Sequence, residues 1–105
     1  MFGLSVRFTC KDPESAEGFD KLVAETVAQI KTNEPGTLVY AVHTVEGKPL
    51  ERIFYELYRD RAAFDAHEEQ PHTRRMLAER EQFLTLVEVD FLTLQAGKGT
   101  GGEHA

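Results

Sequence analysis

The sequence predicts an α+β protein with one four-stranded antiparallel sheet whose helices all cover the same face. Two observations lead to this prediction. Segments in which every second residue is apolar alternate with segments of helical spacing, in the order strand, helix, strand, strand, helices, strand. The chain has 105 residues, which suits a single compact domain. With right-handed crossovers, this order gives the split βαβ, or ferredoxin-like, fold.

The first part of the chain predicts a strand, a long helix and a turn. Apolar and polar side chains alternate over residues 4–10, as in a strand with one buried face. A helix is expected over residues 13–32, because Asp12 can cap it, Pro13 suits its first turn and apolar residues recur at helical spacing. The Asn33–Gly36 segment ends this helix, since proline and glycine favour a turn.

The middle of the chain predicts a hairpin. Residues 37–45 and 52–59 are rich in β-branched and aromatic side chains, which favour strands. The Glu46–Pro49 segment between them contains glycine and proline and favours a reversal of the chain. We therefore expect the second and third strands over these two ranges.

The last part of the chain predicts helices, a final strand and a tail. Asp60 is expected to cap a short helix, which Pro71 breaks to begin another. The helix that begins at Pro71 is expected to carry Met76, Leu77, Phe83 and Leu84. Residues 85–94 are predicted as the fourth strand. One domain then spans residues 1–95, and the glycine-rich residues 96–105 are expected to form a disordered tail.

Composition excludes several classes of partner. The net charge of −6 gives an acidic surface that repels phosphate backbones, so we expect no nucleic-acid partner. The single cysteine, Cys10, excludes an internal disulfide and offers no spacing for a zinc or iron–sulfur site, which predicts a reducing compartment. The first residues lack a signal-peptide core, and no run approaches the roughly 18 apolar residues of a membrane span. We expect a cytoplasmic protein without membrane attachment.

The sheet face that the helices leave open is expected to serve as an interface. On the third strand this face carries one of two alternative sets, Phe54, Glu56 and Tyr58 or Ile53, Tyr55 and Leu57. On the first strand it shows Arg7, which Glu88 and Asp90 of the fourth strand could face. Apolar surface rimmed by paired charges commonly marks an interface. We therefore expect a homodimer formed sheet to sheet, with a solvated sheet face as the alternative.

Two histidines are the strongest candidates for chemistry, although composition and spacing do not identify a reaction. His67 and His72 lie on either side of Pro71, so both rings could turn toward one pocket. A histidine that titrates near neutral pH is suited to accepting a phenol or enol proton. The alternative is that each ring bonds a neighbouring carbonyl. We expect no metal site, because the adjacent Glu68 and Glu69 are typical of a solvated helix surface.

A third histidine lies on the second predicted strand. His43 and Tyr40 point to opposite faces of that strand, since they are an odd number of residues apart. One of the two must face the helices and the other the open side. The sequence leaves open which of His43, His67 and His72 faces the pocket.

Four short motifs make the chain similar to a known family. They are the Glu34–Tyr40 segment after the first helix, the Phe54–Tyr58 strand, Phe64–His67, and Pro71 followed by His72. Together they resemble the antibiotic biosynthesis monooxygenase (ABM) domain family, over residues 4–94. This resemblance implies a ferredoxin-like chain paired into a dimeric α+β barrel. Characterised members of that family include oxygenases that oxidise phenols or quinols without flavin or metal, haem-degrading enzymes and an isomerase of a phosphorylated metabolite.

The resemblance implies a quinol monooxygenase-like reaction on a small aromatic molecule, with no cofactor. We expect His67 or His72 to act as the base that deprotonates the substrate, because the deprotonated phenol can itself donate an electron to O₂. Arg74 or Arg75 could stabilise a developing oxyanion. The residues expected to shape the substrate pocket are Tyr40, Tyr55, Tyr58 and Phe64.

Three other functions stay open beside this one. Haem degradation in the family relies on a pocket tryptophan, and this chain has none. The family's aromatic on the third strand is often tryptophan, where this chain has Tyr58. Isomerisation of a phosphorylated metabolite would need a cationic anchor, for which Arg7, Arg52, Arg74 and Arg75 are available. The remaining alternative is a small-molecule-binding or structural dimer without turnover.

Overall fold

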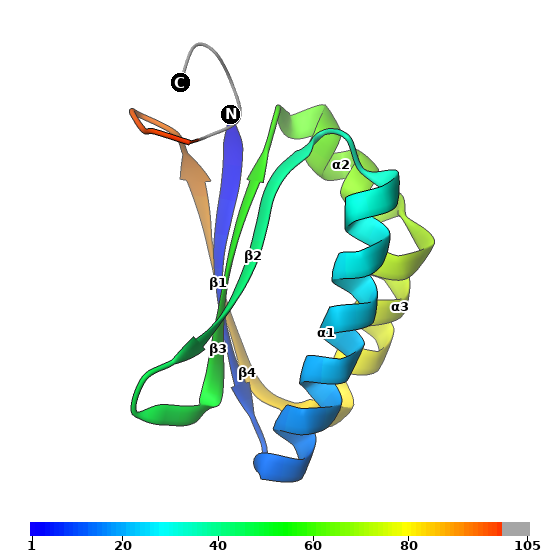
Figure 1. The fold of residues 1–105 in the computed structure, drawn as a ribbon, viewed down its shortest axis with the longest axis vertical. Coiled ribbons are helices and arrows are strands. Elements are labelled where there is room, and N and C mark those ends of the chain that lie inside the picture. The colour runs from blue at the N-terminus through cyan, green and yellow to red at the C-terminus, as the bar shows by residue number, and fades with distance from the viewer. Residues whose placement is uncertain (100–105) are drawn as a thin grey trace.

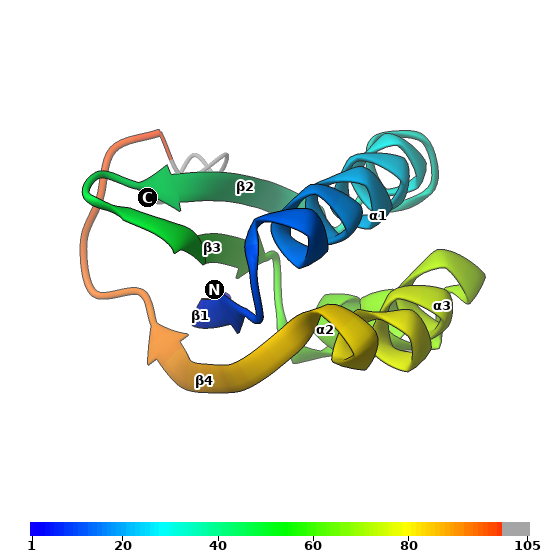
Figure 2. The ribbon, with the colours of Figure 1, turned by 90° about the horizontal axis from the view of Figure 1, so that it is seen from below.

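The chain forms one sheet with its helices on a single face. The computed structural model describes residues 1–99. Its elements are β1 (Phe2–Cys10), α1 (Pro13–Asn33), β2 (Thr37–Val45), β3 (Lys48–Tyr58), α2 (Arg61–Glu69), α3 (Pro71–Glu79), the short 3₁₀ helix η1 (Arg80–Phe83) and β4 (Leu84–Thr93). The strands pair antiparallel in the order β2-β3-β1-β4, and Figures 1 and 2 show the helices on one side of them. The predicted ferredoxin-like α+β fold is confirmed.

The predicted helix starts form as expected. The Asp12 carboxylate accepts a hydrogen bond of 2.7 Å from the backbone N–H of Ser15, and Asp60 accepts one of 2.8 Å from Ala63. Each bond satisfies a backbone donor that the first turn of a helix leaves free. No described helix has both the length and the apolarity needed to cross a membrane.

The hairpin between β2 and β3 is tighter than predicted. The turn consists of Glu46 and Gly47 alone, and β3 begins at Lys48. Gly47 adopts a φ of +76°, a left-handed conformation that a two-residue hairpin loop requires and that glycine adopts without strain. Pro49 belongs to the strand, near the shift in pairing register, where a missing N–H is tolerated.

The chain leaves α3 earlier than predicted. This helix ends at Glu79, Phe83 belongs to η1, and Leu84 is the first residue of β4. The tighter 3₁₀ turn reverses the chain, and the Phe83 carbonyl accepts a hydrogen bond of 2.9 Å from the Lys11 N–H. Of the predicted tail, residues 96–99 form no helix or strand, and the rest lies outside the described residues.

The core lies between the sheet and the helices. Phe8, Phe54 and Phe19 of α1 are at most 1% exposed. The rings of Phe8 and Phe54 lie 4.6 Å apart, edge to face. Each such buried aromatic contributes about 1.5–3 kcal/mol through area removed from water. The helix-covered side therefore holds the bulk of the fold's stability.

Cross-strand pairing settles which residues face the helices. Directly paired residues share a face of the sheet. Tyr40 pairs with Glu56, so both face the helices, whereas His43 pairs with Ile53 on the open face. The set Phe54, Glu56 and Tyr58 therefore faces the helices, and Ile53, Tyr55 and Leu57 face the open side. On the same open face, Arg7 lies opposite Glu88, as predicted.

Candidate active site

A cavity of about 150 Å³ lies between the sheet and helices α2 and α3. Its walls are mostly apolar and include Phe64 and Met76. Its lining also contains six polar side chains, Tyr40, Glu56, His67, Glu68, Thr73 and Arg80. An apolar hollow with a few polar groups is typical of a small-molecule site.

Glu34 organises one side of this cavity from the end of α1. Its backbone N–H caps the helix by donating to the Ile30 carbonyl at 3.1 Å. Gly36, two residues later, allows α2 to come close: a Cβ at this position would lie 2.7 Å from the Cβ of Ala63. The turn after α1 thus brings the Glu34 carboxylate against α2.

Both predicted histidines converge on the Glu34 carboxylate. His67 belongs to the last turn of α2 and His72 to the first turn of α3, on either side of the break at Pro71. The Nδ1 atom of His67 lies 2.7 Å from Glu34 Oε1, and His72 Nε2 contacts Glu34 Oε2. The Thr37 hydroxyl also donates to Oε1, at 2.7 Å. Within residues 1–99 neither ring bonds a carbonyl, so the alternative raised by the sequence does not apply.

These hydrogen bonds keep Glu34 ionised. Burial by itself would raise the pKa of Glu34, but the bonds from His67, Thr37 and His72 lower it to about 2. An ionised carboxylate only accepts hydrogen bonds, so the ring nitrogens that meet it must carry the protons. When His67 is neutral, its proton is therefore on Nδ1, and Nε2 is a free base.

The two histidines differ in their access to the cavity. The His67 side chain lines it, and within residues 1–99 its Nε2 has no hydrogen-bond partner. His72 is not among the cavity's lining residues and uses Nε2 to bind Glu34. The geometry therefore suits His67 for proton transfer and His72 for holding Glu34.

A second buried pair, Glu56 and Tyr58, meets the cavity through Glu56, which lines it. The Tyr58 hydroxyl donates to Glu56 Oε1 at 2.6 Å, and both side chains are buried. Burial and the neighbouring Glu56 raise the pKa of Tyr58, and burial raises the pKa of Glu56 although the Tyr58 bond opposes this. Burial likewise raises the pKa of Tyr40. Both tyrosines are therefore neutral hydrogen-bonding groups at physiological pH.

The structure brings together most of the predicted pocket residues. Tyr40 and Phe64 line the cavity with His67. The ring of Tyr58 packs 5.3 Å from those of both Phe64 and His67, with its hydroxyl turned to Glu56. Tyr55 does not join them, because alternation along β3 places it on the opposite face of the sheet, where it pairs with Ser5.

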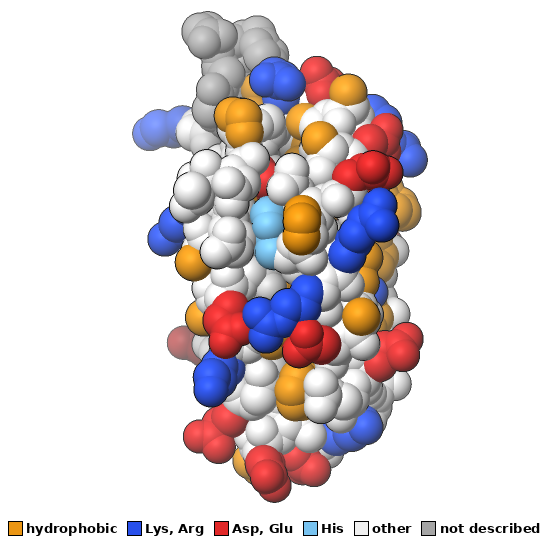
Figure 3. All heavy atoms as spheres, turned by 90° about the vertical axis from the view of Figure 1, so that its right-hand side faces the viewer, with side chains coloured by type: hydrophobic (Ala, Val, Ile, Leu, Met, Phe, Trp, Pro, Cys, Tyr) orange, Lys and Arg blue, Asp and Glu red, His pale blue; other side chains and the backbone are white. Residues whose placement is uncertain are grey.

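The arginines are placed differently from the expectation. Arg74 and Arg75 form ion pairs on the helix surface, with Glu69 and with Glu25 and Glu79 respectively. Figure 3 shows Lys and Arg side chains interspersed with Asp and Glu on that face. Arg7 pairs with Glu51 and Arg52 with Asp20. The arginine that lines the cavity is Arg80, whose guanidinium lies 5.6 Å from the centroid of the Phe8 ring.

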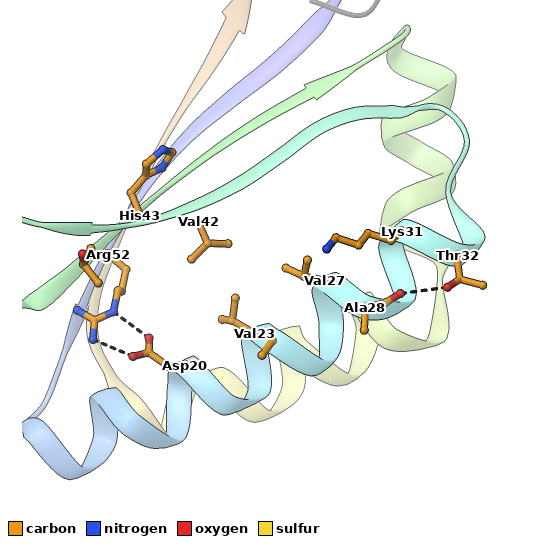
Figure 4. A pocket seen from close by; sticks show the side chains of 11 residues that line it. Asp20, Val23, Val27, Ala28, Lys31, Thr32, Val42, His43 and Arg52 are labelled. Atoms are coloured by element: carbon orange, nitrogen blue, oxygen red, sulfur yellow. Dashed lines mark hydrogen bonds and ion pairs between the residues drawn. The ribbon is translucent and has the colours of Figure 1, made fainter.

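A second hollow, larger than this cavity, lies on another side of α1. It is a groove of about 640 Å³ between α1 and β2, with Val23, Val27 and Val42 on its walls (Figure 4). The Asp20–Arg52 pair, with bonds of 2.8 and 3.0 Å, occupies one end. The His43 ring points to the other side of β2 (Figure 4). Besides the Asp20–Arg52 pair, Lys31 also lines this groove, and its amine points into it (Figure 4).

Two site residues were missed by sequence reasoning. From the sequence, Glu34 was expected only as part of a turn, and Glu56 only as one of the residues that could occupy the open face of the third strand. An acid between two aromatics on one face of β3, as Glu56 is between Phe54 and Tyr58, was a signal of a buried carboxyl. Within residues 1–99 no group of three or more His, Cys, Asp or Glu side chains is arranged to hold a metal ion.

Comparisons with known proteins address the family and the fold of the chain. The family model described as antibiotic biosynthesis monooxygenase matches residues 1–79. A candidate antibiotic biosynthesis monooxygenase from Caulobacter crescentus CB15 superimposes with a TM-score of 0.84 at 22% identity, over 90% of each chain. A Mycobacterium tuberculosis protein gives 0.83 at 24% identity, over 91% of this chain and 96% of that one.

A third solved structure is somewhat more similar in sequence. A Pseudomonas aeruginosa protein gives a TM-score of 0.81 at 27% identity, over 90% of this chain and 94% of that one. The search among curated proteins finds no significant match. The structural likenesses support the ferredoxin-like fold, and the family model covers most of the chain. The chain therefore belongs to the antibiotic biosynthesis monooxygenase family.

Proposed function

We propose that this chain is a monooxygenase that oxidises a small phenol or quinol with O₂, using His67 as the base and requiring no bound cofactor. The observation that supports this function is the placement of the His67 ring. Ionised Glu34 holds its Nδ1, and the ring lines an apolar cavity in which Nε2 is free to take a proton. A carboxylate behind the imidazole also stabilises the imidazolium that forms.

The size of the cavity favours a single aromatic ring. In another protein, a dry cavity of about 150 Å³ binds benzene. The cavity here has the same volume, and its lining includes Val89 and Phe91, which are 44% and 63% exposed. A larger fused substrate could therefore bury one ring and rest the others on this apolar mouth.

The proposed reaction uses O₂ as its oxidant. His67 Nε2 takes the substrate hydroxyl proton, and the resulting anion gives one electron to O₂ within this mostly apolar cavity. The aromatic radical and superoxide then combine to form a carbon–oxygen bond. Loss of the ring proton and cleavage of the O–O bond leave one oxygen in the product and one in water. Arg80 takes the oxyanion-stabilising role that was expected of Arg74 or Arg75.

We also propose that the chain acts as a homodimer joined through the open face of the sheet. On this face Leu92 of β4 is 37% exposed and lies opposite Gly3 of β1, which pairs with Leu57 of β3 on its other side; Leu86, on the same face of β4, is 50% exposed. Such a surface, rimmed by Arg7 and Glu88, is typical of an interface.

Isotope labelling tests the proposed function. The wild-type chain is supplied with ¹⁸O₂ and a panel of hydroquinones and phenols, and the products are examined by mass spectrometry. One labelled oxygen atom in the product supports the proposal. Quinols that raise the melting temperature without oxygen consumption would instead indicate a binding protein without turnover.

A further inference from the structure

Glu56 is a buried carboxyl that forms no ion pair with any described residue. It is 6% exposed and lies on the helix-facing side of β3, in the lining of the cavity that His67 also lines. Within residues 1–99 its one hydrogen-bond partner is the Tyr58 hydroxyl, on Oε1. Its second oxygen, Oε2, has no partner there. The titratable groups around it are Tyr58 on the same strand, Tyr40 on β2, His67 and Glu68 on α2, and Arg80 in η1.

Physical chemistry favours a neutral Glu56. An ionised carboxylate taken out of water costs several kcal/mol unless a cation or several donors compensate it. Glu34 has such compensation from three donors. Glu56 has a single donor, and protonation removes the cost. Two carboxyls of one site are then held in opposite states, the arrangement by which enzymes separate acid from base roles.

Tyr58 also determines which oxygen carries the proton. Its hydroxyl donates to Oε1, so Oε1 acts as the carbonyl oxygen of the neutral acid. The proton is then on Oε2, the oxygen to which no described side chain forms a hydrogen bond. Because Tyr58 is fully buried, this orientation is fixed by packing before any substrate binds.

We propose that Glu56 is the catalytic acid of this site, a neutral carboxyl that protonates the peroxide formed from O₂. The inference rests on the proposed function. Oε2 gives its proton to the terminal oxygen of the peroxide anion, which produces a hydroperoxide and a Glu56 carboxylate. That carboxylate then removes the hydrogen from the ring carbon that carries the hydroperoxide. The O–O bond breaks, and a carbonyl forms at this carbon as hydroxide leaves. The hydroxide takes the proton held by His67 and leaves as water, so both residues return to their starting states.

Infrared spectroscopy tests the protonation state without any substrate. The full-length wild-type chain at neutral pH is compared with Glu56→Gln, which keeps the shape and the acceptor for Tyr58. The carbonyl stretch of a protonated carboxylic acid is expected in the wild type and absent from Glu56→Gln. The control Glu17→Gln changes an exposed position on α1 and is expected to keep the band. A wild type without such a band at neutral pH overturns the proposal.

Turnover tests the catalytic role. Glu56→Gln is expected to lower kcat for hydroquinone oxidation by about 100-fold or more, because an amide can hold the peroxide but cannot protonate it. Glu17→Gln is expected to match the wild type, and unchanged circular dichroism of Glu56→Gln shows that it folds. A wild-type rate in Glu56→Gln overturns the catalytic role. If the wild type consumes no oxygen with any quinol, the proposed function and the turnover role fail together, while the infrared band still decides whether Glu56 is an acid.

Discussion

The Glu34 carboxylate is the residue on which the geometry of the site depends. It accepts hydrogen bonds from two imidazoles and a threonine hydroxyl, and these donors compensate the cost of burying its charge. Its ionised state in turn fixes the proton of His67 on Nδ1 and leaves Nε2 for the substrate. One buried charge thus determines both the tautomer and the direction of the ring.

This charge makes a prediction about stability and pH. Because the folded pKa of Glu34 is about 2, below its ordinary value, the stabilisation is complete above about pH 4.5 and is lost as the pH falls toward 2. The shift corresponds to a contribution on the order of 3 kcal/mol. Glu34→Gln should therefore be less stable than the wild type at pH 7, and the difference should shrink toward pH 2. Urea unfolding of both proteins at several pH values measures it, and a difference that is constant with pH would contradict the account.

Much of this residue-level arrangement was beyond sequence reasoning. The spacing of His67 and His72 on either side of Pro71 was enough to predict that the two rings lie close together. Their common partner could not be predicted, because Glu34 is more than thirty residues away in the chain and meets them only after the α1–β2 turn packs against α2. The sequence also could not tell which of Tyr40 and His43 faces the helices, because the register of β2 on β3 decides it.

At the scale of the elements, the site depends on how closely the α1–β2 turn approaches α2. Gly36 makes this approach possible and lies two residues after Glu34, while Ala63 lies four residues before His67. Strand and helix periods predicted these elements well, because each buries one face. The ends were less predictable, since the hairpin turn at Gly47 and the early end of α3 depend on backbone geometry and on chain reversal.

Gly36→Ala tests this contact. The added Cβ would lie 2.7 Å from the Cβ of Ala63, so α2 must shift away from Glu34. We expect a loss of about 1–3 kcal/mol in unfolding free energy and a weaker Glu34–His67 bond, seen as a change in the His67 ring NMR signals. The control Gly47→Ala strains a left-handed turn in open space and should cost about 1–2 kcal/mol without changing those signals. Unchanged His67 signals in Gly36→Ala would show that the close approach does not position the site.

At the scale of the whole molecule, the two faces of the sheet have different roles. The helices cover one face (Figure 2). The core and the cavity lie between that face and the helices. The open face carries the apolar side chains of β3 with Leu86 and Leu92 of β4. Tyr55, which was expected at the substrate, belongs to this second surface, and its role in our account is assembly.

The proposed homodimer predicts a specific sensitivity to charge on the open face. Leu86→Glu should convert the dimer to a monomer, because it places an unpaired carboxylate in an apolar interface. Leu77→Glu, at a similarly exposed apolar position on α3, should keep the dimer mass. Light scattering coupled to size-exclusion chromatography measures both. A monomeric wild type at micromolar concentration would contradict the proposal.

In the proposed reaction, His67, held by Glu34, is the base of an O₂-dependent oxidation. The decisive measurement is the rate of oxygen uptake with a hydroquinone in His67→Ala, compared with the wild type and with His72→Ala. We expect a loss of about 10²–10⁴-fold in kcat for His67→Ala. The loss in His72→Ala should be smaller, because His72 orients Glu34 but does not line the cavity. A wild-type rate of oxygen uptake in His67→Ala would contradict the claim.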